Sequence, residues 1–278
     1  MKKFLLAIIA SGIAMAGFSQ TDSTNIGQAD TIKVGGMIII RKSGNNDSNR
    51  HRDITVSNKR KHTQSNVTTN WWVVDLGFAN YSDNTNYASA AVQQLAPGSN
   101  EDWFKLRTGK SVNVNIWAFM QRLNMVKHYV NLVYGLGVEL NNYRFDDENI
   151  LFQKNPTHIV YNSGADQKMI GKNKMAADYV TVPVMLNINF TPNRKEGFGI
   201  SGGVSAGYLY SARQKLKYDN DKKEKLHSDF DLNKWKLSYI GEVSLGPVRL
   251  YGSYAFKSMW TNSLDQTPYT VGIRFSNW

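Results

Sequence analysis

The sequence predicts an all-β fold: an eight-stranded antiparallel up-and-down transmembrane β-barrel that follows an N-terminal periplasmic segment. Three observations predict it. Aliphatic and polar side chains alternate along eight segments between residues 70 and 278, as in strands with one lipid-facing side. Short and long connections between these segments alternate strictly, as periplasmic turns and extracellular loops do in outer-membrane barrels. The ionisable residues well inside the segments all lie opposite the aliphatic side.

Residues 1–19 have the pattern of a secretory signal peptide. Two lysines precede an apolar run that ends at Ala16, and Gly17 and Ser19 are small enough for the cleavage positions. We therefore expect a mature chain that begins at Gln20. An uncleaved N-terminal anchor is the alternative, but the apolar run is short for a spanning helix.

Composition narrows the class of protein further. The chain contains no cysteine, which excludes a lipoprotein anchor, disulfides and thiolate metal sites. The formal net charge of +11 fits an envelope protein near anionic headgroups. Nucleic-acid binding is the usual alternative for such a charge, and the export signal argues against it. The mean hydropathy of −0.43 would suggest a soluble protein, but a membrane barrel gives the same value because only every second strand residue faces lipid.

Residues 20–69 are expected to form a separate periplasmic segment. Thr31 to Arg41 is a β-like run within polar sequence, and residues 42–66 are rich in Asn, Ser, Lys and Arg, as in a solvated linker. We expect the run to be a short strand that pairs locally or packs near the barrel mouth. The alternative is an edge strand that adds to the sheet of a partner.

The barrel itself is expected over residues 70–278. The predicted strands are 70–80, 110–122, 127–143, 176–191, 198–213, 230–245, 248–257 and 268–278. In the second strand, Met120 falls on the lipid-facing side and Arg122 has the same parity at the strand end. Pro183 in the fourth strand cannot donate a hydrogen bond to a neighbour, so we expect a β-bulge there.

The predicted connections fix the direction of the barrel. The tight ones are 123–126, 192–197 and 246–247, and the longer ones are 81–109, 144–175, 214–229 and 258–267. An even number of strands then leaves both termini in the periplasm. The dense mixture of charges in 214–229 is expected to be a solvated loop.

Six ionisable residues are expected to form a structural charge network in the lumen: Asp75, Glu139, Lys236, Glu242, Arg249 and Arg274. An arginine or lysine facing lipid at mid-membrane would cost about 2–4 kcal/mol, so the inward placement is what a membrane would select. We predict lumenal salt bridges between Glu242 and Arg249 and between Asp75 and Arg274. A gate or proton path is the alternative to a structural role.

The lumen is expected to be plugged. The interior of an eight-stranded barrel is just wide enough for its own side chains. The bulky residues predicted to point inward are Trp71, Trp117, Phe119, Tyr129 and Met185. We therefore expect no open pore.

Several segments resemble a known family. The last strand, TPYTVGIRFSNW, looks like the C-terminal signal that the barrel-insertion machinery reads in outer-membrane barrels. The segments NWWVVDLGFANYSD, YVTVPVMLNINFTP and GFGISGGVSAGYLY resemble the PorT-like outer-membrane β-barrel proteins of Bacteroidota-type Gram-negative bacteria. The resemblance covers about residues 70–278 and implies the barrel. The family takes its name from a component of a protein-secretion system, and no functional residue carries over.

The expected function is non-enzymatic: a barrel in the bacterial outer membrane that acts through its extracellular loops in envelope structure, adhesion or surface binding. The expected partners are outer-membrane lipid and lipopolysaccharide, the barrel-insertion machinery and, through residues 20–69, secretion or envelope proteins. An accessory role in secretion is the first alternative. A lipid-modifying enzyme is the second, disfavoured because none of the histidines lies mid-strand near a serine. No cofactor or metal site is expected.

Overall fold

The computed structural model describes residues 30–34, 37–41, 65–163, 169–192, 194 and 197–276. The chain divides into two compact units, Met1–Thr63 and Gln64–Trp278. The expected signal peptide, most of the linker and the terminal Trp278 lie outside the described residues.

The first unit contains a small antiparallel sheet. Strands β1 (Asp30–Val34) and β2 (Met37–Arg41) pair along their whole length, with Asp30 opposite Arg41. The segment expected as one strand is therefore two strands that pair with each other.

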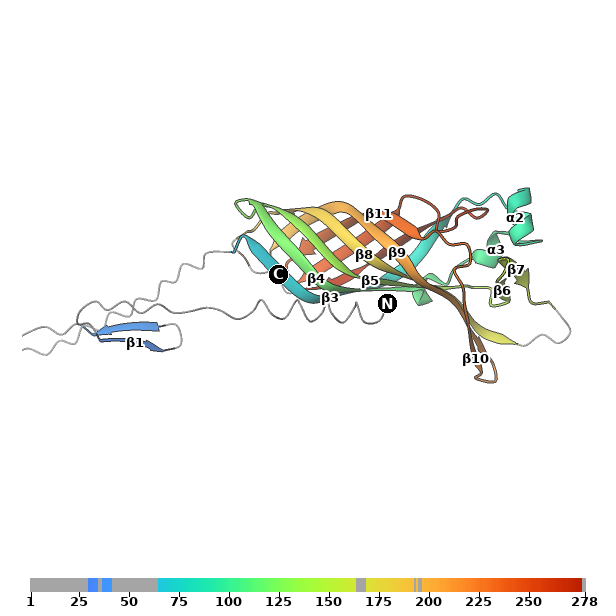
Figure 1. The fold of residues 1–278 in the computed structure, drawn as a ribbon, viewed down its shortest axis with the longest axis horizontal. Helices are drawn as coiled ribbons and strands as arrows, with labels where there is room; N and C mark the ends of the chain where they lie inside the picture. Colours follow the sequence, from blue (N-terminus) through green and yellow to red (C-terminus); the bar gives the residue numbers. More distant parts are fainter. Residues whose placement is uncertain are drawn as a thin grey trace, which may run out of the picture. The chain divides into compact units, whose positions relative to one another are not determined.

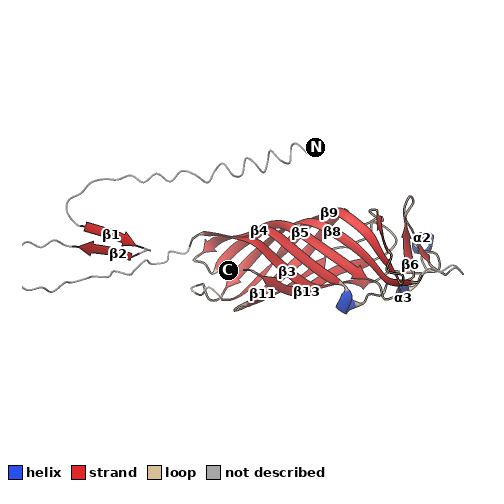
Figure 2. Ribbon diagram, turned by 90° about the horizontal axis from the view of Figure 1, so that it is seen from below, coloured by secondary structure: helices blue, strands red, loops and turns tan. Residues whose placement is uncertain are grey.

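The second unit is a closed ring of eight antiparallel strands, seen side-on in Figure 1 and Figure 2. In ring order they are β3 (Val67–Asp83), β4 (Val112–Val126), β5 (Val130–Arg144), β8 (Ile170–Asn189), β9 (Phe198–Tyr218), β11 (Trp235–Leu245), β12 (Val248–Ala255) and β13 (Gln266–Phe275). Each strand pairs with the next, and β13 pairs with β3 to close the ring. The predicted eight-stranded up-and-down barrel is confirmed.

Some predicted boundaries were wrong. β4 continues through Val126, so the first tight turn lies at 127–129, where Lys127 and His128 have φ angles of 45° and 62°. β11 begins at Trp235, not at Phe230. β8 and β9 are longer than expected, and β9 pairs beyond the ring with β10 (Lys223–His227). Residues 214–229 are therefore largely strand, not a solvated loop.

Side chains alternate between the two faces of the wall as predicted. On β8, Val180, Val182, Val184, Leu186 and Ile188 are 41–53% exposed on the outside, while Thr181 and Met185 between them are 1% and 2% exposed. Apolar side chains cover the outer face, and polar side chains with a few bulky ones fill the inner face. This is the inverse of a water-soluble β-barrel.

One irregularity reverses this alternation in β3 and β4. Trp72 has a φ of 57°, and the pairing of β4 with β5 shifts by one residue at Ala118. Before Trp72 on β3 and after Ala118 on β4, the two faces are exchanged. Trp71 is 65% exposed and its ring lies 6.1 Å from that of Phe119 on the outer face, whereas Met120 is fully buried. The predicted inward placement of Trp71 and Phe119 and outward placement of Met120 were therefore wrong, because one extra residue exchanges the two faces.

A second irregularity lies in β9. Asp178 on β8 pairs with Ser211, but Tyr179 pairs with Leu209, so Tyr210 is the extra residue. Beyond it, Gln214 is buried on the inner face. Arg213 therefore turns to the outer face.

Two further expectations fail. The bulge predicted at Pro183 is absent: β8 pairs regularly with β9 there, and its pairing with β5 stops at Tyr134/Val184 and resumes at Gly137/Thr181 in unchanged register. Tyr129, expected inside, is 50% exposed.

The long connections carry structure of their own. They contain α2 (Ala90–Leu95), α3 (Glu101–Phe104), the 3₁₀ turn η1 (Thr108–Lys110), and the hairpin of β6 (Ile150–Gln153) and β7 (His158–Tyr161). The short helices begin at side-chain caps: the Ser89 hydroxyl accepts from the Val92 N–H at 3.4 Å, and the Asn100 side chain accepts from Trp103 N–H at 3.3 Å. None of the helices in the described ranges is long and apolar enough to cross a membrane.

Candidate functional site

The first candidate site is the polar interior of the barrel. The six residues predicted from the sequence all point inward and are at most 8% exposed: Asp75, Glu139, Lys236, Glu242, Arg249 and Arg274. They come from five strands, β3, β5, β11, β12 and β13. The closed ring thus brings together residues that are up to 199 positions apart.

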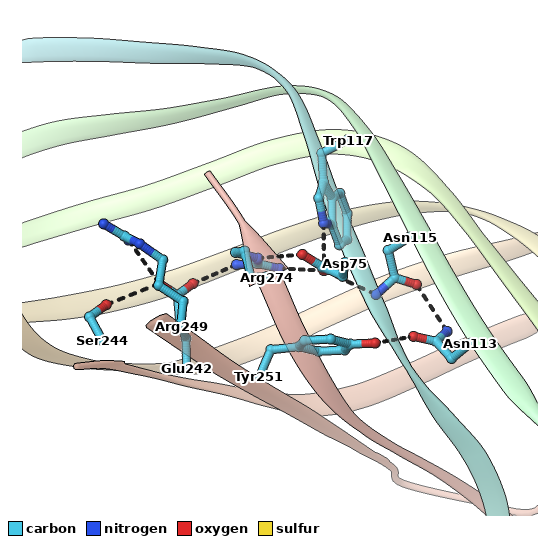
Figure 3. A network of polar contacts seen from close by, with 9 residues as sticks. All are labelled: Asp75, Asn113, Asn115, Trp117, Glu242, Ser244, Arg249, Tyr251 and Arg274. Carbon is cyan, nitrogen blue, oxygen red and sulfur yellow. Dashed lines mark hydrogen bonds and ion pairs between the residues drawn. The ribbon is translucent and has the colours of Figure 1, made fainter. Parts of the chain in front are cut away.

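Arg274 is the centre of the network (Figure 3). Its Nε and Nη2 donate to the two carboxylate oxygens of Asp75 at 2.7 and 2.8 Å, and its Nη1 donates to Glu242 Oε2 at 2.6 Å. Asp75 is fully buried and also accepts a hydrogen bond from Trp117 Nε1 at 2.8 Å. Every charge in this group has an opposite charge beside it, which offsets the cost of removing it from water.

Glu242 continues the network toward the short-turn end of the barrel. Its Oε1 accepts from Arg249 Nη1 at 3.1 Å and from the Ser244 hydroxyl at 3.3 Å. Both salt bridges expected from the sequence are therefore present. Arg122 was expected on the outside. It lines a small cavity with Arg249 instead, because the irregularity at Ala118 exchanges the two faces of β4 beyond that residue.

A relay of asparagines connects this group to the remaining charges. Asn115 Nδ2 donates to Asp75 at 3.1 Å, and Asn113 Nδ2 donates to the side-chain oxygens of Asn115 and Asn141 at 3.0 and 2.8 Å. Asn141 Nδ2 donates in turn to Glu139 Oε1 at 3.0 Å.

Lys236 completes the network from β11. Its ammonium forms an ion pair with Glu139 and lies 5.4 Å from the centre of the Tyr179 ring. All six predicted residues thus belong to one hydrogen-bonded network across the lumen. The sequence analysis did not predict that asparagines join the two ion-pair groups. The signal was the alternation VNVN at 112–115, with Asn141 on the next strand.

The charges of this network are paired with one another. Each of its carboxylates accepts from a cation or an amide, and each cation is bound to a carboxylate. Among the described residues, no group of three or more His, Cys, Asp or Glu side chains is placed to hold a metal ion.

The second candidate site is the long-loop end, where the connections pack into a cap. Phe152 of β6 is the centre: its ring lies 5.8 Å from Phe145, 5.4 Å from Phe230 and 6.0 Å from Trp260. These rings come from three of the four long connections and are at most 3% exposed. A buried aromatic cluster fixes the relative positions of the loops.

Polar groups fasten the cap to the wall. Gln214 of β9 accepts from the Phe152 N–H at 3.0 Å and donates to the Ile150 carbonyl at 2.8 Å. Asn173 of β8 accepts from Gln214 Nε2 at 2.9 Å. The inner faces of β8 and β9 therefore hold β6 by its backbone. In the connection between β3 and β4, the Tyr87 hydroxyl donates to Asp83 at 2.6 Å, and burial raises the pKa of that phenol.

One surface hollow brings a histidine at the end of a strand near serines. His227, Ser211, Ser228 and Asp229 line a cavity of about 330 Å³ beside Tyr210. Within the described ranges, no hydrogen bond joins His227 to either serine, so the group lacks the base–nucleophile contact that covalent catalysis requires.

Comparison with known proteins identifies a family for this chain. A family model described as "Outer membrane protein beta-barrel domain" matches residues 42–259, which is most of the chain. No curated protein matches.

Proposed function

The chain belongs to the outer membrane protein beta-barrel domain family, and from this premise we propose that it is a non-enzymatic barrel of the bacterial outer membrane. Its lumen is closed by side chains, and its capped long-loop end faces the exterior and acts in envelope structure, adhesion or surface binding. Both chain termini then lie in the periplasm. The packed cap carries this proposal, because a surface already held in one conformation loses less conformational entropy when it binds.

The lumenal network supports a closed interior. Between the two ion-pair groups, Asn115, Trp117, Glu139, Met185 and Arg274 are among the residues around a cavity of about 20 Å³. Such a volume holds about one water molecule. Ions would have to break the buried salt bridges to pass, so we expect no conductance from the purified protein in a planar bilayer. Stepwise channel openings would contradict a closed lumen.

The orientation can be tested by labelling, because the chain has no cysteine. A single cysteine is introduced by Asn220→Cys in the turn between β9 and β10, or by Lys127→Cys in the first tight turn. A membrane-impermeant maleimide should label Asn220→Cys on intact cells and Lys127→Cys only after the outer membrane is opened. The reverse pattern would place the cap in the periplasm and overturn the proposal.

A secretion accessory role, as in PorT-like proteins, is the second candidate function. The observation that favours it is the β1–β2 sheet, which lies outside the barrel unit and offers two strand edges for a partner. Affinity purification of the mature protein with and without residues 20–69 tests it. A partner that disappears on truncation is expected, and an unchanged set of partners would exclude this role for the segment.

A further inference from the structure

The parts of β8 and β9 beyond the apolar band, together with β10, carry an unusual concentration of positive charge on the outer face. In Figure 1 these strands project from the long-loop end of the ring. We call this group the basic lattice. Its members are Lys172, Lys174, Arg213, Lys215, Lys217, Lys223 and Lys225.

Strand register aligns these lysines in rows. One row is Lys174, Lys215 and Lys225, and the next is Lys172, Lys217 and Lys223. Neighbouring strands are about 4.8 Å apart and alternate residues about 7 Å apart, so the charges form a regular grid.

All members lie on one face of this sheet. The residues between them, Asn173 and Gln214, are at most 1% exposed, and their side chains hydrogen-bond to each other behind the sheet. Two carboxylates share the outer face: Asp178 pairs with Arg213, and Asp221 pairs with Lys217 at 2.6 Å. Arg144, opposite Lys174 on β5, pairs with Glu148 at 3.1 Å.

The arrangement costs stability. Like charges directly opposite each other on adjacent strands are destabilising, and the lattice has four such pairs among its lysines. Partial burial, and then Arg213, lower the pKa of Lys215, and partial burial followed by Arg144 lowers that of Lys174. Among the described residues no carboxylate forms a salt bridge with Lys172, Lys174, Lys215, Lys223 or Lys225, so these lysines lack neutralising negative charge.

The surface next to the lattice indicates what supplies that charge. Along the same outer face, β8 continues into Val180 and Val182, and β9 into Tyr210 and Tyr208, all 41–51% exposed. These residues belong to the band that faces acyl chains in a barrel of this family. Only a few residues of strand separate the acyl-chain surface from the cations.

We propose that the basic lattice binds the phosphate-bearing headgroup of a lipid in the adjoining leaflet, whose acyl chains pack on the apolar face of β8 and β9. This inference rests on the proposed function, because it takes the long-loop end as the outer one and the lipid as the phosphorylated glycolipid of the outer leaflet. A headgroup with several phosphates can contact several lysines of the grid at once. Its affinity is then higher than that of a single phosphate on a single lysine, because each added contact strengthens the same bound state.

A lipid fits better than a soluble polyanion. The lattice adjoins the membrane surface, where a ligand already confined to the leaflet has a high local concentration. Nucleic acid recognition also commonly uses aromatic stacking among the cations, and none of the lattice rows contains an aromatic residue.

The test uses the full chain in neutral detergent and lipid vesicles. The variant K174Q/K215Q/K225Q removes the central row, and K105Q/K110Q/K154Q removes three exposed lysines from the same end of the barrel outside the lattice. Native mass spectrometry and thermal unfolding are recorded with diphosphorylated lipid A, with the dephosphorylated lipid and with soluble inositol hexakisphosphate.

We expect the wild type and the control variant to retain lipid A and to be stabilised by it, and the lattice variant to bind at least about tenfold more weakly. Equal retention by the lattice variant, or equal binding of the dephosphorylated lipid, would overturn the proposal. Stabilisation by inositol hexakisphosphate equal to that by lipid A would assign the lattice to soluble polyanions instead. The labelling of Asn220→Cys reports the orientation of the barrel separately. A reversed barrel can therefore be distinguished from a lattice that does not bind lipid A.

Discussion

Arg274 and Asp75 lie directly opposite each other on β13 and β3, the two strands that close the ring, and form a two-point ion pair. The guanidinium reaches both carboxylate oxygens of Asp75, at 2.7 and 2.8 Å. Such a fork-to-fork contact is sensitive to register, because a shift of one residue would turn one partner to the outside. The pair therefore specifies how the first and last strands meet.

Removing this arginine should be costly. Arg274→Met leaves the carboxylates of Asp75 and Glu242 buried without their shared cation, and losing one member of a buried ion pair typically costs about 3–5 kcal/mol. The midpoint of urea unfolding in micelles, followed by tryptophan fluorescence, should fall markedly. Lys257→Met, at an exposed lysine, is the control and should unfold like the wild type. Equal midpoints for the two variants would show that the network does not stabilise the barrel.

The asparagine relay should also contribute to stability. Asn113→Leu removes the amide that donates to Asn115 and Asn141 and leaves their oxygens without this donor, at a cost of about 1–3 kcal/mol. The same unfolding measurement checks it, with Asn262→Leu on the exposed surface as control. If the two substitutions had the same small effect, the relay would be incidental to stability.

A methyl group at the closing strands should disturb the ring. Gly272 pairs with Gly77, and a Cβ on Gly272 would lie 2.3 Å from the Leu76 carbonyl oxygen and 2.5 Å from the Gly77 Cα. Gly272→Ala should therefore destabilise by about 1–3 kcal/mol. Gly241→Ala is the matched control, because its nearest contact is 3.7 Å, to the Ser201 carbonyl oxygen. The prediction fails if both variants retain the mobility of the folded form on gels without boiling and the same urea midpoint.

The basic lattice should make stability depend on pH. Because the pKa of Lys215 is lowered in the folded protein, the unfolded chain holds more protons between that lowered value and about 10.4. The free energy of unfolding should therefore rise with pH through this interval. The unfavourable contribution of the charged Lys215 to stability is fully present at neutral pH. Lys215→Gln should unfold at higher urea than the wild type at pH 8 in neutral detergent, and the difference should shrink at pH 10. An identical pH dependence for both proteins would refute it.

The cap should be separable from the barrel. Phe152→Ala removes the central ring of the aromatic cluster, a change that typically costs about 3–5 kcal/mol, and the loss should be confined to the loops. Trypsin should then cut the long connections of folded protein while the strands stay intact. Phe190→Ala, at a phenylalanine that is 56% exposed on the outer face, should leave the protease pattern unchanged. Protection of the loops in Phe152→Ala would indicate that they do not depend on this cluster.

The two-residue alternation of the sequence was enough to predict the strand number, the ring closure and the inward direction of Asp75 and Arg274. It could not predict where the alternation breaks. The irregularities at Trp72, Ala118 and Tyr210 have no distinctive composition, yet each exchanges the faces of the residues beyond it on its strand, which is why Trp71 and Arg122 were misplaced. The loop cap was missed for another reason: its core joins aromatic residues from distant connections, and no local period marks them.

Ring closure by β13 and β3 also has a consequence during biogenesis. Until the last strand is available, β3 has no partner on one side, and its backbone groups are open to unwanted pairing with other chains. Contacts this distant in sequence form slowly. We therefore expect truncation at the carboxyl end to convert the chain into a substrate for aggregation or proteolysis even if every other strand is intact.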